Sequence, residues 1–222
     1  MANVTEVVFI LDKSGSMHGL EADTIGGFNS MLKKQKESDE KTYITTILFS
    51  DSSELIHDRT DLLEVKDMTE KDYYPGGCTA LLDTVGEAIE RIKLIHKYVR
   101  EEDRPDKTLF VIITDGEENA SRKYSYAQIK ALINEQQKKH EWEFIYLGAN
   151  IDAAASADTI GISKNKAFQY KSDKKGTACS YSAVGNALFA FRSMNIEDMA
   201  DFEMELPGYM SAVTEDVKKR GR

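Results

Sequence analysis

The segment Val7-Val8-Phe9-Ile10-Leu11-Asp12-Lys13-Ser14-Gly15-Ser16 decides the fold class of this chain. Its first five residues form an unbroken apolar run, rich in β-branched side chains, that stops at a carboxylate. Runs that are apolar on both faces are typical of parallel strands buried inside a sheet. The sequence therefore predicts a buried strand that leads directly into a polar loop.

The rest of the chain repeats this pattern between longer amphipathic stretches. Apolar runs predict buried strands at residues 43–49, 109–113 and 144–147, a weaker strand is expected at 166–170, and mixed polarity predicts an edge strand at 53–59. Helical spacing predicts helices around residues 25–32, 82–92 and 129–133, a short helix after Asp152, and a last helix beginning near Ser180. Ser125 and Gln128 are spaced as a capping box. Alternating strands and helices predict a mostly parallel sheet covered on both faces.

The composition places the chain among α/β proteins with one sizeable core. Its 222 residues are 41% apolar, and 29 basic and 38 acidic side chains give a net charge of −9. This charge argues against binding to nucleic acids or membrane surfaces. Two cysteines and four histidines argue against a disulfide scaffold or a cysteine-rich zinc site. No apolar stretch approaches the ~18 residues of a membrane span. The N-terminus does not resemble a signal peptide, so we expect a cytoplasmic protein.

The sequence is expected to form one domain over residues 1–194. From about Asn195 the helical periodicity fades, and the chain ends in the basic cluster Lys218-Lys219-Arg220-Gly221-Arg222. We therefore predict that residues 195–222 form a solvated C-terminal tail with the composition of a flexible end.

Oxygen-bearing side chains follow the predicted strands at their carboxyl ends. Asp12, Ser14 and Ser16 follow the first strand, Asp115 follows the strand at 109–113, and Thr79 lies in a glycine-rich loop before the second helix. In open parallel sheets, ligands bind at the carboxyl ends of the strands, where the strand order reverses. If the two strands are neighbours, these residues meet at that point.

The donor atoms of this set point to a hard cation. They are carboxylate and hydroxyl oxygens without a thiolate or an imidazole, which suits Mg²⁺, Mn²⁺ or Ca²⁺ rather than zinc or copper. Two carboxylates and three neutral hydroxyls leave such an ion coordinatively unsaturated. The ion is then expected to keep water or to recruit an oxygen anion from another molecule.

Three short motifs carry a resemblance to a known family: Asp12-x-Ser14-x-Ser16 after an apolar strand, Gly77-x-Thr79 at a helix start, and Thr114-Asp115-Gly116 after a second strand. Together they resemble the metal-ion-dependent adhesion site of von Willebrand factor A (VWA) domains. The resemblance covers roughly residues 4–194. It implies a Rossmann-like, doubly wound, mostly parallel six-stranded sheet with one antiparallel edge strand and helices on both faces. It also implies that Asp12, Ser14, Ser16, Thr79 and Asp115 hold the metal. Lacking export signals and disulfides, the chain resembles compact intracellular bacterial or phage members of the family.

The resemblance implies a non-enzymatic protein-binding module in which an Asp or Glu of the partner completes the metal coordination. One alternative is a metal-dependent phosphoryl-transfer hydrolase, but Ser14 stands where such enzymes carry a second acid, and a serine is no carboxylate general acid. Another is a VWA domain whose metal is purely structural. The partner and the oligomeric state stay open.

Residues around the predicted site have simpler interpretations. We expect Glu117 and Glu118 at the rim of the site, and Cys78 as a small buried residue. Trp142 is expected to be a packing anchor and His18 a solvated loop residue. Thr79 could also serve as a helix N-cap.

Overall fold

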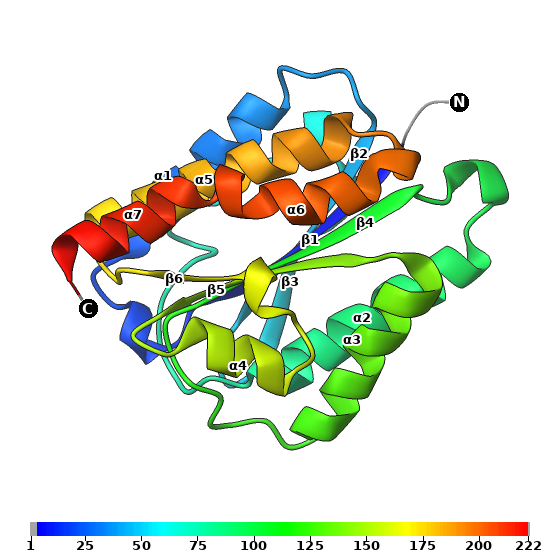
Figure 1. The fold of residues 1–222 in the computed structure, drawn as a ribbon. Helices are drawn as coiled ribbons and strands as arrows, with labels where there is room; N and C mark the ends of the chain where they lie inside the picture. Colours follow the sequence, from blue (N-terminus) through cyan, green and yellow to red (C-terminus); the bar gives the residue numbers. More distant parts are fainter. Residues whose placement is uncertain (1–3, 222) are drawn as a thin grey trace.

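A six-stranded sheet with the strand order β3-β2-β1-β4-β5-β6 runs through the centre of the computed structural model, which describes residues 4–221 (Figure 1). The strands are β1 (Thr5–Asp12), β2 (Thr42–Phe49), β3 (Ser53–Asp61), β4 (Lys107–Thr114), β5 (Glu143–Ala149) and β6 (Ala167–Tyr170). All neighbouring pairs are parallel except β2 and β3, which are antiparallel with irregular register between Ile44 and Ile47. The predicted mostly parallel sheet with one antiparallel edge strand is confirmed.

Helices cover both faces of this sheet (Figure 1). One face carries α1 (Glu21–Gln35), α5 (Lys174–Ser193), α6 (Met199–Tyr209) and α7 (Ser211–Arg220), and the other carries α2 (Leu81–Tyr98), α3 (Tyr126–His140) and α4 (Ala153–Thr159). Side chains of β1 alternate between the two resulting cores. Val7 and Phe9 pack into the first core, and Val8 and Ile10 into the second. Burial on both faces explains why the run is apolar at every position.

Local hydrogen bonds set the helix starts. The predicted capping box of Ser125 and Gln128 is present at the start of α3. Asp152 caps α4 as expected for a helix that follows it. α5 starts at Lys174, earlier than the predicted start near Ser180, because the carboxylate of Asp173 accepts a hydrogen bond from the backbone N–H of Gly176 at 2.9 Å.

The predicted solvated tail is wrong for the part of residues 195–222 that the structure describes. This segment forms α6 and α7, and both helices pack on the first core. Phe202, Leu206 and Met210 are fully buried, and the ring of Phe202 meets that of Phe191 at a centroid distance of 5.0 Å. Many charged residues and Pro207 within α6 weaken the helical pattern of the sequence, so these buried positions were missed.

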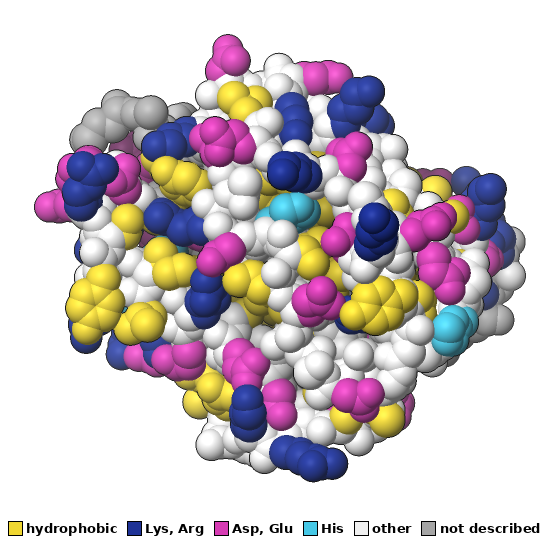
Figure 2. All heavy atoms as spheres, turned by 180° about the vertical axis from the view of Figure 1, so that it is seen from behind, with side chains coloured by type: hydrophobic (Ala, Val, Ile, Leu, Met, Phe, Trp, Pro, Cys, Tyr) yellow, Lys and Arg dark blue, Asp and Glu magenta, His cyan; other side chains and the backbone are white. Residues whose placement is uncertain are grey.

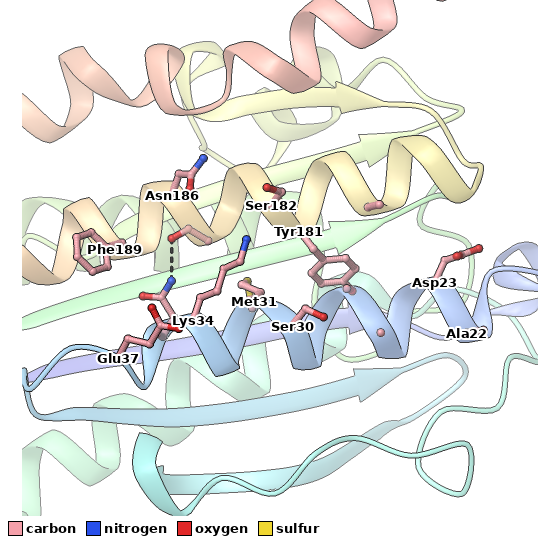
Figure 3. A pocket seen from close by; sticks show the side chains of 15 residues that line it. Ala22, Asp23, Ser30, Met31, Lys34, Glu37, Tyr181, Ser182, Asn186 and Phe189 are labelled. Carbon is pink, nitrogen blue, oxygen red and sulfur yellow. Dashed lines mark hydrogen bonds between the residues drawn. The ribbon is translucent and has the colours of Figure 1, made fainter.

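α1 and α5 lie side by side, and small residues allow the close approach (Figure 3). The Tyr181 ring of α5 lies over Gly27 of α1, where an added Cβ would come within 2.6 Å of the ring. The side chain of Gln35 donates to the carbonyl of Gly185 at 2.8 Å (Figure 3). Any larger residue at position 27 would therefore push the two helices apart.

Lys107, at the start of β4, joins the sheet to the end of α5. Its ammonium donates hydrogen bonds to the carbonyls of Phe191, Arg192 and Met194 at 2.8, 2.7 and 2.6 Å. We expect Lys107→Met to lower the free energy of unfolding by about 2–4 kcal/mol, since it removes a buried donor from three carbonyl groups. Urea unfolding measures this, with the exposed Lys33→Met as the matched control. Equal stability of the two variants would contradict the prediction.

Among residues 4–221, no helix combines the length and the apolar character needed to cross a bilayer.

Candidate metal centre

The predicted site residues converge at the carboxyl ends of β1 and β4. These two strands are direct neighbours, with Leu11 opposite Ile113. The order of the sheet reverses between them, because the chain goes from β1 outward to β2 and β3 and then returns to β4. Asp12 and Asp115 therefore lie where a doubly wound sheet binds its ligands.

Asp12 is fixed in place by neutral hydrogen-bond donors. Its carboxylate accepts from the backbone N–H of Ser14 at 2.7 Å and from the hydroxyl of Thr114 at 2.6 Å. Its carbonyl accepts from the buried Tyr73 hydroxyl at 2.6 Å. The first two bonds orient the carboxylate, and the third holds the backbone of Asp12 at the end of β1.

A short 3₁₀ turn, η1 (Gly15–Met17), brings the two serines together. The hydroxyl oxygens of Ser14 and Ser16 are 3.0 Å apart, and the Ser16 hydroxyl donates to Asp115 at 2.5 Å. Ser14 is buried, whereas Ser16 is exposed. Ser16 thus lies at the mouth of the site and links the loop after β1 to the loop after β4.

The glycine-rich loop before α2 supplies the third side of the site. Its backbone is tied to the first loop by two hydrogen bonds, from Gly15 N–H to the Gly77 carbonyl at 3.0 Å and from Gly76 N–H to the Lys13 carbonyl at 2.8 Å. Gly77 has a φ of +80°, a conformation that favours glycine. The loop could not close on η1 in this form with a β-branched residue there.

Thr79 joins the site across Gly116. An added Cβ at Gly116 would lie 3.4 Å from the Thr79 hydroxyl oxygen and 3.5 Å from that of Ser16. Thr79 is not the N-cap of α2, because Ala80 occupies that position. Its backbone instead pairs with Asn119 through bonds of 2.9 and 3.0 Å. The alternative role of Thr79 as helix cap is therefore wrong, and its hydroxyl is not used in capping.

No described residue gives the two carboxylates of the site a positive partner. Asp12 and Asp115 are 1% and 2% exposed, and in the described part of the chain their hydrogen-bond partners are all neutral. Lys13, the adjacent cation, pairs with Glu54 at 2.5 Å instead. Burial raises the pKa of Asp12, and hydrogen bonds from Ser14 and Thr114 oppose the rise. Two buried, uncompensated carboxylates favour the binding of a cation.

The donor chemistry fits a hard divalent ion. Residues 4–221 contain no cluster of three or more His, Cys, Asp and Glu side chains that could hold a metal. A metal at this position would therefore depend on the serine and threonine hydroxyls as well as the two carboxylates. Oxygen-only sets of this kind suit Mg²⁺, Mn²⁺ or Ca²⁺. Bound there, such an ion would supply a Lewis-acidic centre for an oxygen ligand.

Sequence reasoning missed two hydroxyls that hold the carboxylates. The sequence analysis included Thr114 in the motif Thr114-Asp115-Gly116 but assigned it no role. Its position directly before Asp115 could have indicated that it lies close to the end of β1. Ser172, in the loop after β6, donates to Asp115 at 3.2 Å. The next residue, Asp173, pairs with Arg220 at the end of α7 at 2.5 Å, so the C-terminal helix braces this loop. No local pattern could have indicated Ser172.

The residues around the site differ partly from expectation. Glu117 is exposed as a rim residue, but the Glu118 carboxylate accepts hydrogen bonds from the backbone N–H groups of Leu82, Ala120 and Ser121. Glu118 thus caps the start of α2. Cys78 is exposed rather than buried, and its backbone N–H donates to the carboxylate of Asp51 at 3.1 Å.

Two aromatic or imidazole side chains lie as expected. Trp142 is buried as a packing anchor, and His18 is exposed in the loop that follows Ser16.

Comparison with known proteins identifies the fold. No protein-family model and no curated protein sequence matches this chain. Among solved structures, it is similar to the vWF domain of the type V pili tip protein Mfa5 from Porphyromonas gingivalis, with a TM-score of 0.62 and 11% identity over 88% of this chain and 98% of that one. The chain therefore has the fold of the von Willebrand factor A domains.

Two further structures are similar over part of their length. The D319A mutant of the PilB minor pilin from Streptococcus sanguinis gives a TM-score of 0.59 and 13% identity over 90% of this chain and 63% of that chain. Proximal thread matrix protein 1 from the mussel byssus, with a zinc-occupied MIDAS motif, gives a TM-score of 0.52 and 14% identity over 92% of this chain and 46% of that chain. This chain spans less than two thirds of either protein.

Proposed function

We propose that this protein is a non-enzymatic, divalent-metal-dependent protein-binding module. Asp12, Ser14, Ser16, Thr79 and Asp115 hold the metal, and an Asp or Glu side chain of a protein partner completes its coordination. The observation that carries the proposal is the convergence of oxygen donors from three loops around two buried carboxylates that have no basic partner among residues 4–221.

Coordination number explains why a partner is needed. Mg²⁺ prefers six ligands in an octahedral arrangement, and the site offers five side chains. At least one position is then left for water or for a carboxylate from another molecule. Because Ser16 is exposed, we expect the free side of the site to face solvent. Because the Glu118 carboxylate is engaged with backbone amides, Glu117 is the exposed acid next to Asp115 that an acidic partner has to pass.

The relatives in fold support this proposal in a limited way. The mussel protein holds zinc at its motif, which supports metal binding by such a fold and makes Zn²⁺ a competitor to test beside Mg²⁺, Mn²⁺ and Ca²⁺. Two others are pilus proteins by name, which agrees with a binding rather than a catalytic role. The cytoplasmic location and the intracellular type of VWA domain stay predictions.

A nucleic-acid partner is not part of the proposal. Basic and acidic side chains are interspersed on the face shown in Figure 2, and the net charge of the chain is −9. Phosphate backbones bind to surfaces where basic residues dominate.

Metal titration tests the proposal directly. We expect calorimetry to detect binding of Mg²⁺ and Mn²⁺ at millimolar or lower concentrations, and Ser16→Ala to weaken binding about tenfold by removing one ligand. The exposed Ser30→Ala on α1 is the matched control and should bind like the wild type. No uptake of either ion by the wild type would rule out the site.

The relaxation of water protons near bound Mn²⁺ distinguishes a metal that binds a partner from a metal that only stabilises the fold. Bound Mn²⁺ with an open position enhances the relaxation of exchanging water protons, and a glutamate-containing peptide should reduce this enhancement where its glutamine counterpart does not. If bound Mn²⁺ shows no exchanging water and no response to the peptide, the metal is structural and the partner model fails.

A further inference from the structure

An open groove lies between α1 and α5 on the outer surface of these two helices (Figure 3). It has a volume of about 610 Å³, and the buried residues Met31, Gln35 and Tyr181 are part of its lining. None of the candidate metal ligands lines the groove. The groove is therefore a surface separate from the candidate metal centre.

The exposed residues of the groove are unusually small. They recur at four-residue spacing on both helices, as Ala22, Gly26 and Ser30 on α1 and as Ala178 and Ser182 on α5. Residues four apart lie on the same face of a helix, so each helix presents a shallow stripe to solvent. Solvated helix faces usually carry charged side chains. Small residues instead allow the axis of another helix to approach closely.

Contacts between α1 and α5 fix which of their residues lie level with each other. An added Cβ at Gly27 would come within 2.6 Å of the Tyr181 ring, and one at Gly185 would lie 3.2 Å from the Met31 side chain. The two helices therefore run in the same direction. In this register Phe189 is level with the last residue of α1.

The two ends of the groove differ in character (Figure 3). Toward one end, the Phe189 ring of α5 is 50% exposed, and Lys34 of α1 is exposed on the same side. Toward the other end lie Ala22, Ala178 and the carboxylate of Asp23. Within the described part of the chain, neither Asp23 nor Lys34 forms an ion pair. One end thus offers a large apolar ring and a cation, and the other offers space and an anion.

A half-turn about the middle of α1 brings unlike ends of two such grooves together. Two copies of α1 then lie antiparallel, and Asp23 of each copy faces Lys34 of the other. Phe189 of each copy meets the open end beside Ala22 of the other, and Glu37, which follows α1, lies outside the overlap. We propose that the groove is the interface of a symmetric dimer of this chain. Two-fold dimers are the commonest soluble homo-oligomers, and their interfaces are self-complementary in this way.

The dimer directs its two candidate metal sites away from each other. α1 begins at Glu21, shortly after the turn that carries Ser16. Antiparallel copies of α1 therefore place the two sites at opposite ends of the assembly. Dimerisation itself needs no metal, so it is testable whether or not the proposed function holds.

Sedimentation equilibrium of the full chain in EDTA tests the proposal. We expect a monomer–dimer equilibrium with a Kd of about 10 µM, because the groove offers one large apolar anchor per copy. The mass should rise from 25.0 kDa toward twice that value and stop there. A monomer at about 200 µM, expected if a different protein fills the groove, or masses that grow past the dimer, expected for a head-to-tail chain, would overturn the proposal.

Phe189→Ser removes the apolar anchor and should weaken the dimer at least about tenfold. Leu94→Ser is the matched control, because Leu94 is 58% exposed on α2, which covers the opposite face of the sheet. This control should dimerise like the wild type, and the melting temperature of each variant checks that it is folded. Wild-type dimerisation by a folded Phe189→Ser variant would contradict the interface.

Charge exchange tests the register of the two copies. Asp23→Lys and Lys34→Asp each place like charges opposite each other, so each should weaken the dimer about tenfold. The double variant Asp23→Lys/Lys34→Asp restores unlike pairs and should recover most of the affinity. A mixture of the two single variants should form a mixed dimer more tightly than either variant pairs with itself. If the double variant dimerises as weakly as the single variants, the two residues do not face each other and the proposed dimer is wrong.

Discussion

Asp12→Asn is expected to weaken Mg²⁺ and Mn²⁺ binding by more than about 100-fold, because the variant loses one of only two carboxylates available to the ion. Without metal, the same variant should be as stable as the wild type or more stable. The Asn side chain keeps the shape and an acceptor for the Ser14 N–H. It also removes a buried charge whose partners, within the described part of the chain, are all neutral.

This combination distinguishes a binding site from a structural feature. Calorimetry measures the metal affinity, and urea unfolding in EDTA measures the stability. The exposed Asp39→Asn changes the net charge equally and should change neither quantity. If Asp12→Asn unfolds readily without metal, the carboxylate mainly supports the loops; if it binds Mn²⁺ like the wild type, the ion lies elsewhere.

Phe202→Ala is expected to lower the free energy of unfolding by about 3–5 kcal/mol, the usual cost of removing a fully buried aromatic ring. Phe202 is 0% exposed and packs edge-on against Phe191 of α5. Met204 on the same helix is 76% exposed, so Met204→Ala should stay within about 0.5 kcal/mol of the wild type. Chemical denaturation of the two variants side by side makes the measurement.

The comparison tests whether the C-terminal helices are part of the folded domain in solution. If Phe202→Ala is as mild as Met204→Ala, α6 is detached from the core. The solvated tail expected from the sequence would then be the better description of residues 195–222.

The sheet could be predicted because its inner strands are buried on both faces. Val7 to Leu11 and Leu109 to Ile113 face helices on either side, so nearly every position is apolar and the runs stand out in the sequence. The C-terminal helices could not be predicted in the same way. They bury one narrow stripe each, and charged residues with Pro207 obscure the spacing of that stripe.

The site residues could be predicted where they lie close together in one loop of the sequence. They could not be predicted where the contact joins residues that are far apart in the sequence. Asp12, Ser14 and Ser16 lie within five residues, and strand adjacency places Asp115 beside them. The hydroxyl of Ser172 contacts Asp115 from a loop that lies 57 residues further along the chain. This contact depends on how distant strands pair, which no local sequence pattern specifies. The roles of the metal and of the partner stay proposals that the titrations decide.

The two edges of the sheet make it a poor template for extra strands. At one edge, β3 carries Glu54, Asp58 and Arg59, and its pairing with β2 is irregular. At the other, β6 is only four residues long, and α7 packs against it. Charged, irregular or very short edges oppose strand-by-strand polymerisation. Assembly through backbone ladders is thereby disfavoured, so another molecule has to engage this protein through its loops and side chains.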